Sequence, residues 1–155
     1  MYNGLVHLHN LLRWVILLFL LIAIIRHLSG MSSKRLINAS DRKVDLFLMV
    51  SAHIMFVVGL YQWIAGPWGL KLIQNAGMSQ VMKNSQLRYW AVEHITGMLI
   101  AIILITIGRG AVKRSDNWTV HKKAFWFFFI ALVVILAMVP WPFREGIGRP
   151  WFPGM

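Results

Sequence analysis

The sequence predicts an all-α fold, a transmembrane four-helix up-down bundle. Hydrophobic residues make up 58% of the 155-residue chain and charged residues only 14%, whereas about 25% of the residues in soluble domains are charged. The apolar residues gather in four runs, each close to the roughly 20 residues that a helix needs to cross a bilayer. At this length we expect one integral membrane domain covering residues 1–155.

The four spans follow one another with polar or interfacial segments between them. The spans cover residues 5–28, 44–65, 86–108 and 118–139. The second span ends before Gly66-Pro67, because proline lacks an N–H donor and clashes with the preceding turn. The connection 67–85 is mildly amphipathic and can lie in the membrane interface. The tail, residues 140–155, is rich in Pro, Gly and Trp, so we expect an ordered interfacial hook and not a helix.

The composition excludes several classes of site. The chain has no cysteine, which excludes disulfides, thiolate-bound metals, iron–sulfur clusters and covalent c-type haem. It has no hydrolase triad motif, Walker loop or dinucleotide fingerprint. The formal charge of +11 comes from basic residues in the gaps between the apolar runs. We therefore expect these basic residues to bind the anionic surface of the lipid bilayer. We expect no nucleic-acid partner.

The basic residues also predict the orientation. Ten lysines and arginines lie in the loops that join span one to two and span three to four, against six on the opposite side. Loops rich in lysine and arginine stay in the cytoplasm. We therefore expect a multi-pass protein of the bacterial inner membrane with both termini in the periplasm, on the outer side.

A pair of histidines is expected across the outer half of the bundle. His7 and His9 open the first span, and His94 lies about 9 Å below the outer end of the third. The first and third helices of an up-down bundle face each other diagonally. His7 and His9 point about 200° apart, and we favour His9 because Arg13 lies on its face. Histidines facing across a bundle core are typical axial ligands of haem b.

Other residues of the outer half could complete a haem site. Gly97 and Ala101 share the helix face of His94, where small side chains leave a groove for a porphyrin; the alternative is close helix packing. Arg13 and the other outer arginines could bind the haem propionates, or could instead reach the lipid phosphates.

A second haem could lie between His53 and His121 on the inner side. His53 sits in the apolar segment VSAHIMFVV and is expected to find a partner across the bundle. It lies about 10 Å deeper than His121, so one ring would have to tilt strongly. We expect His27 and His121 at the membrane interface.

Two alternatives to haem remain open. His7, His9, His94 and Glu93 could form a non-haem site for zinc, copper or iron, provided that the first turns are extended. Glu93 could instead form an ion pair with Arg13 or Arg88, or serve as a proton relay. The second alternative to haem is a cofactor-free accessory or assembly subunit of a larger respiratory or membrane complex.

Several stretches carry a resemblance that covers all four spans and the tail: LVHLHNLLRW, SAHIMF, RYWAVEHITGMLIAIILITIGRG, HKKAFWFFF, PWPFR and RPWF. With them the chain resembles small bacterial membrane proteins, found especially in Bacteroidota, that are labelled "cytochrome b". Its architecture is also similar to the four-helix cytochrome b561-type proteins.

The resemblance implies electron transfer through haem b, with quinone or a small reductant as the partner. Cytochrome b561-type proteins often place two ligands about 13–14 residues apart on one helix. Here the nearest spacing on one helix is 18, from His9 to His27. We therefore expect one outer haem, in an electron-transfer protein or in a subunit of a quinone or small-molecule oxidoreductase.

Overall fold

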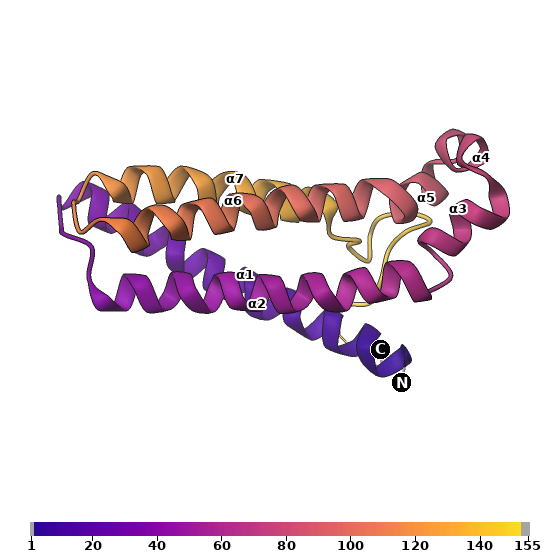
Figure 1. Cartoon of the computed structure of the whole chain (residues 1–155), viewed down its shortest axis with the longest axis horizontal. Helices are drawn as coiled ribbons and strands as arrows, with labels where there is room; N and C mark the ends of the chain where they lie inside the picture. The colour runs from indigo at the N-terminus through magenta and orange to yellow at the C-terminus, as the bar shows by residue number, and fades with distance from the viewer. Residues whose placement is uncertain (1, 153–155) are drawn as a thin grey trace.

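The structure, a computed structural model, describes residues 2–152, and these residues form helices without any strand. Four segments are long and apolar enough to cross a membrane, which makes the chain a multi-pass membrane protein. Their main helices are α1 (Tyr2–Ser32), α2 (Ala39–Ala65), α6 (His94–Arg114) and α7 (Val120–Met138) (Figure 1). The all-α transmembrane bundle predicted from the sequence is confirmed.

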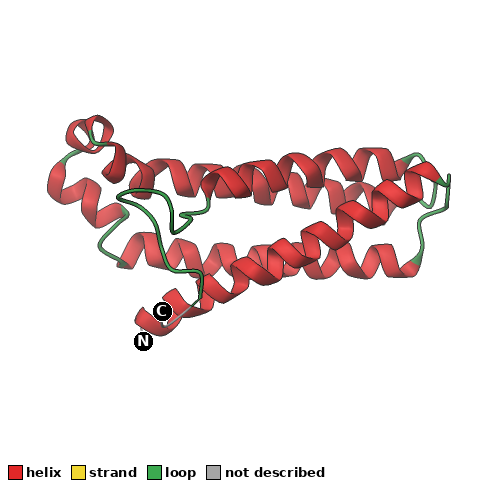
Figure 2. Cartoon of the chain, turned by 180° about the vertical axis from the view of Figure 1, so that it is seen from behind, coloured by secondary structure: helices red, strands yellow, loops and turns green. Residues whose placement is uncertain are grey.

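The helices pack in the ring order α1, α2, α6, α7, which leaves α1 diagonally opposite α6 and α2 diagonally opposite α7. Helix α1 is inclined to the other three, so that its N-terminal end diverges from α6 and α7 (Figures 1 and 2). We call the end with residues 33–38 and 115–119 the loop end. The opposite end, with residue 2, the connection 66–88 and the tail 139–152, is the terminal end.

Helix α2 begins five residues before the predicted span, at a capping box. The Asn38 side chain accepts from the N–H of Asp41, and the Asp41 carboxylate accepts from the N–H of Asn38. Asp41 is buried and paired with Arg26 at 2.8 Å and with Arg35 at 2.7 Å. The hydrogen bond to Asp41 raises the pKa of Arg35, so that the guanidinium stays charged. Because these ion pairs neutralise the charge of Asp41, α2 can begin in this charged segment, ahead of the apolar span.

The terminal end is closed by short elements. Helix α2 ends at Ala65, as Gly66-Pro67 predicts, and α3 (Leu70–Ala76), α4 (Met78–Lys83) and α5 (Ser85–Arg88) follow. The π-helical segment η1 (Tyr89–Glu93) then leads into α6. The tail is irregular over residues 139–152 and crosses the terminal end as a loop (Figure 2). Residues 140–152 are non-helical, as expected, whereas their position at the membrane interface stays a prediction, and residues 153–155 lie outside the described part of the chain.

Glycines of α6 bring α6 and α7 into close contact. A Cβ at Gly97 would collide with the Met138 side chain, and one at Gly108 would lie 2.7 Å from Phe128 Cε1. Gly97, which we considered as the wall of a porphyrin groove, therefore admits Met138 instead. The outer surfaces of the helices carry large exposed apolar side chains, as a lipid-facing surface requires, among them Leu18, Ile25, Val57, Ile103 and Val133.

Candidate functional site

A cavity of about 540 Å³ lies in the terminal half of the bundle, where α1 diverges. Ligand and cofactor sites usually have about 300–1,000 Å³. Residues of α1, α2 and α6 form most of its wall, and the tail contributes Pro140, Arg149, Pro150 and Phe152. Most of the lining side chains are apolar, with a small number of polar groups among them.

His9 and His94 both line this cavity. Their ring centroids are 6.3 Å apart, and they belong to the diagonally opposed helices α1 and α6. Two imidazoles on opposite sides of one metal ion, with metal–nitrogen bonds of about 2.0 Å, have centroids about 6 Å apart. The spacing of this pair, which we call the open pair, therefore suits two ligands of a shared metal ion.

The His94 ring is oriented by a backbone carbonyl. Its Nδ1 lies 2.9 Å from the Met138 oxygen, and the Tyr89 hydroxyl donates to the same oxygen at 2.6 Å. This carbonyl accepts no helical backbone hydrogen bond, because α7 ends at Met138 and because Pro142, four residues later, has no N–H. The bond assigns the proton to Nδ1 and leaves Nε2 unprotonated, which is the orientation typical of a metal-bound histidine.

His9 occupies a space that a glycine provides. A Cβ at Gly59 of α2 would lie 3.2 Å from His9 Nε2. Within residues 2–152, neither ring nitrogen of His9 has a hydrogen-bond partner. His7 is exposed, and although it also lines the cavity, the ring found near His94 is that of His9. Of the two histidines, His9 is therefore the one that the structure brings together with His94.

Two buried donors in the cavity wall lack acceptors. Arg13 Nε and Gln62 Nε2 have no hydrogen-bond partner within the described residues. The rest of the Arg13 guanidinium is held by the tail, because Nη2 donates to the Trp151 oxygen at 2.7 Å. A buried unpaired donor costs about 1–3 kcal/mol. The cavity therefore suits a guest that brings acceptor oxygens.

The outer arginines have different roles. Arg149 is the second arginine in the cavity wall, and its guanidinium stacks on the Trp90 ring at 4.9 Å. Arg144 donates to the Ala137 oxygen at 3.0 Å and so caps the end of α7. Arg88 binds Glu93 at 2.6 Å. Of the roles considered for Glu93, the structure shows the ion pair with Arg88.

The set proposed for a non-haem metal does not converge. His7 is exposed, and Glu93 is held by Arg88 away from the open pair. Over residues 2–152 there is no group of three His, Cys, Asp or Glu side chains placed to hold a metal ion.

A second histidine pair lies at the loop end. Nδ1 of His27 is 2.8 Å from Nδ1 of His121, and Nε2 of His27 is 3.1 Å from Asp45 Oδ2. All three side chains are buried. The ring centroids are 5.0 Å apart, and a Cβ at Gly30 would collide with the His121 ring. We call His27 and His121 the closed pair, because nothing the size of a cofactor fits between them.

The closed pair corrects the prediction for the inner side. A second haem between His53 and His121 was considered possible, and both His27 and His121 were expected at the membrane interface; the structure buries both. His53 is exposed instead, with its Nδ1 2.8 Å from the Met49 oxygen of its own helix. The inclination of α1 brings His27 against α7 at the loop end, so that His27 takes the place expected for His53.

Sequence reasoning overlooked two polar residues of these sites. Asp45 lies just inside the second predicted span, and a carboxylate at that position was a usable signal of a buried partner. Gln62 is uncharged and gave no comparable signal.

Comparisons with known proteins give no relative for this site. No family model matches the chain, and neither a curated protein nor a solved structure shows significant similarity to it.

Proposed function

We propose that this protein is a membrane electron carrier that binds one haem b in the terminal cavity, where His9 and His94 would hold it. The observation that carries the proposal is the open pair: two imidazoles from diagonal helices that line one cavity with their ring centroids 6.3 Å apart. Haem, when bound, supplies reversible one-electron chemistry.

The unpaired donors in the cavity wall support the same guest. Carboxylates accept hydrogen bonds from guanidinium and amide groups, and such charge-assisted bonds are the stronger ones. Arg13 Nε and Gln62 Nε2 are two donors that would bind the propionates. The Arg13 and Arg149 guanidinium groups would also offset the propionate charge.

The other residues of the site hold the ligands in place. The Met138 carbonyl accepts from Nδ1 of His94, so it fixes the tautomer and leaves Nε2 available to a metal. Gly59 leaves room for His9, and the apolar wall keeps water away from the ligands. Burial and hydrogen bonding around the ligands are the means by which a protein sets a haem potential.

The proposed location is the bacterial inner membrane. The excess of lysine and arginine at the loop end supports a cytoplasmic position for that end. The open pair would then lie near the periplasmic leaflet, where a quinone or a larger respiratory complex is the candidate redox partner. The resemblance to proteins labelled "cytochrome b" points the same way.

The test is the reduced-minus-oxidised absorption spectrum of the full chain, purified in detergent from haem-replete cells. We expect an α band at about 560 nm. His9→Ala and His94→Ala should each lose the band, whereas His53→Ala, which removes a histidine facing away from the cavity, should keep it. Folded wild-type protein without the band, or a band unchanged in His94→Ala, would refute the proposal.

A further inference from the structure

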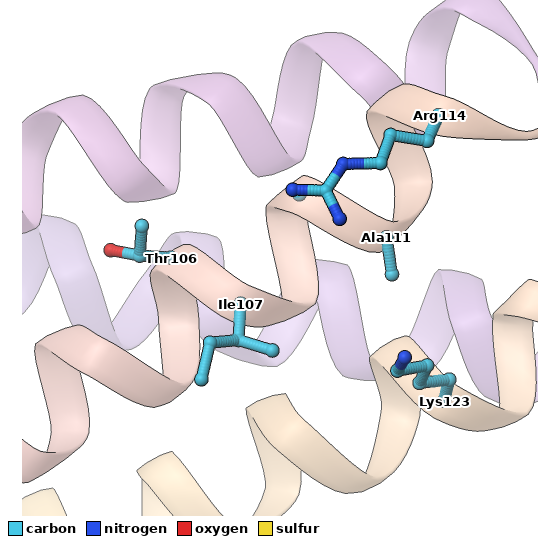
Figure 3. A pocket seen from close by; sticks show the side chains of 6 residues that line it. Thr106, Ile107, Ala111, Arg114 and Lys123 are labelled. Carbon is cyan, nitrogen blue, oxygen red and sulfur yellow. The ribbon is translucent and has the colours of Figure 1, made fainter.

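A second cavity, of about 270 Å³, lies between α6 and α7 at the loop end, far from the open pair. It is lined by Thr106, Ile107, Gly110, Ala111, Arg114 and Lys123 (Figure 3). The Thr106 hydroxyl donates to the Ile102 oxygen of its own helix, so its proton is not available to a guest in the cavity. The cavity is therefore apolar along α6 and basic where it reaches the loop end.

The two basic side chains of this cavity are free. Within residues 2–152, neither Arg114 nor Lys123 has a hydrogen bond or an ion pair from its side chain. Arg26 and Arg35 bind Asp41, and Arg42 binds Asp116. Nε and Nη1 of Arg109 also lack partners within the described residues, but Arg109 does not line this cavity. Two uncompensated cations at one cavity attract an anion.

The side chains converge on the cavity. A Cβ at Gly110 would lie 3.7 Å from Arg114 Nη2, so the guanidinium folds back along α6 over Gly110. Figure 3 shows the Arg114 side chain directed back along α6 and the Lys123 amine directed from α7 toward Ala111. The N-terminus of α7 adds the positive end of a helix dipole, without an acidic residue in its first turn.

The depth of the cavity matches a lipid rather than a free ion. From Thr106 to Arg114 the wall extends about 12 Å along α6. Ile107 is 44% exposed, so this wall faces the bilayer. The basic end then lies at the headgroup level, and the apolar part lies beside the acyl chains.

We propose that this cavity binds one anionic phospholipid. Its phosphodiester lies between Arg114 and Lys123, and one acyl chain runs along Ala111 and Ile107. Basic pockets between transmembrane helices on the cytoplasmic side are suited to such headgroups. This proposal is independent of haem.

The test is native mass spectrometry of the detergent-solubilised full chain, titrated with phosphatidylglycerol, phosphatidylcholine or inorganic phosphate. We expect a one-to-one adduct with phosphatidylglycerol and none with the other two at the same concentration. The pair Arg114→Gln and Lys123→Gln should weaken the adduct about 30-fold, or roughly five-fold for each basic residue. The pair Lys113→Gln and Lys122→Gln, with the same charge change on the same helices outside the cavity, should stay within about two-fold of the wild type.

A second variant separates the acyl chain from the charge. Ala111→Phe fills the apolar part of the cavity, keeps both cations and should also weaken the phosphatidylglycerol adduct. An equal loss in the control pair would mean a diffuse attraction, and equal binding of phosphatidylcholine or phosphate would mean no such site. Either result overturns the proposal. If the double variant does not fold, each single substitution, at about five-fold, decides the question.

Discussion

The open pair and the closed pair are built from the same side chains in opposite ways. The closed pair has a 2.8 Å contact between ring nitrogens, an Asp45 carboxylate behind it and Gly30 against it. The open pair has ring centroids 6.3 Å apart, and Nδ1 of His94 lies 2.9 Å from the Met138 carbonyl oxygen and 3.4 Å from the Tyr89 hydroxyl. In the closed pair, both ring nitrogens of His27 and Nδ1 of His121 have protein partners, whereas the buried Nε2 of His121 has none within residues 2–152. In the open pair, the nitrogen with protein partners is Nδ1 of His94, so each ring keeps a nitrogen available to a guest.

The inclination of α1 produces this difference. At the loop end, α1 lies against its neighbours and its histidine reaches His121 directly. At the terminal end, α1 diverges and the tail closes the gap with Trp151, whose oxygen accepts from Arg13 and from the Trp14 indole. A histidine pair in a membrane bundle therefore indicates a cofactor only where the helices leave space between the rings.

The largest expected effect is on the closed pair. Asp45→Ala leaves the buried Nε2 of His27 without a partner and should lower the free energy of unfolding by about 3 kcal/mol. Thermal unfolding in detergent, followed by circular dichroism, measures it. Asp116→Ala, at an exposed ion pair with Arg42, is the matched control and should change little. An equal loss of unfolding free energy in both variants would show that the buried network stabilises the protein no more than an exposed ion pair does.

The next largest effects are expected from alanine substitutions at Gly30 and Gly59, which distinguish the closed pair from the open pair. Gly30→Ala should destabilise the protein by about 1–3 kcal/mol, because the new methyl collides with the buried His121 ring. Gly59→Ala meets His9 at 3.2 Å, so the ring can shift into the cavity. This variant should keep its melting temperature and lose haem affinity. Both quantities are measured on both variants, and the same pattern in the two would contradict the distinction between the pairs.

The smallest effect concerns Gln62. Gln62→Leu removes an unpaired buried donor, so the haem-free protein should become more stable by about 1 kcal/mol. The same change should weaken haem binding about ten-fold, because one donor to a carboxylate is lost. An unfolding measurement checks the gain in stability, and a haem titration checks the loss of haem affinity. Gln80→Leu, at an exposed position, is the control for both. A loss of stability together with unchanged haem affinity would show that Gln62 is not part of the haem site.

The sequence predicted the bundle and the position of the open pair, because both depend on span length and depth along a helix. Depth alone could not choose between His27 and His53 as the partner of His121. That choice depends on which helix face points inward, and therefore on the inclination of α1. The start of α2 was missed for another reason, because Asp41 reads as a loop residue until Arg26 and Arg35 are seen to neutralise it.

The molar ratio of haem to protein in the purified full chain tests the central claim most directly. An open pair and a closed pair predict one haem per chain, lost in His94→Ala and retained in His121→Ala. A ratio of two would contradict the claim. So would a haem that survives His94→Ala and disappears with His121→Ala, because it would then belong to the closed pair.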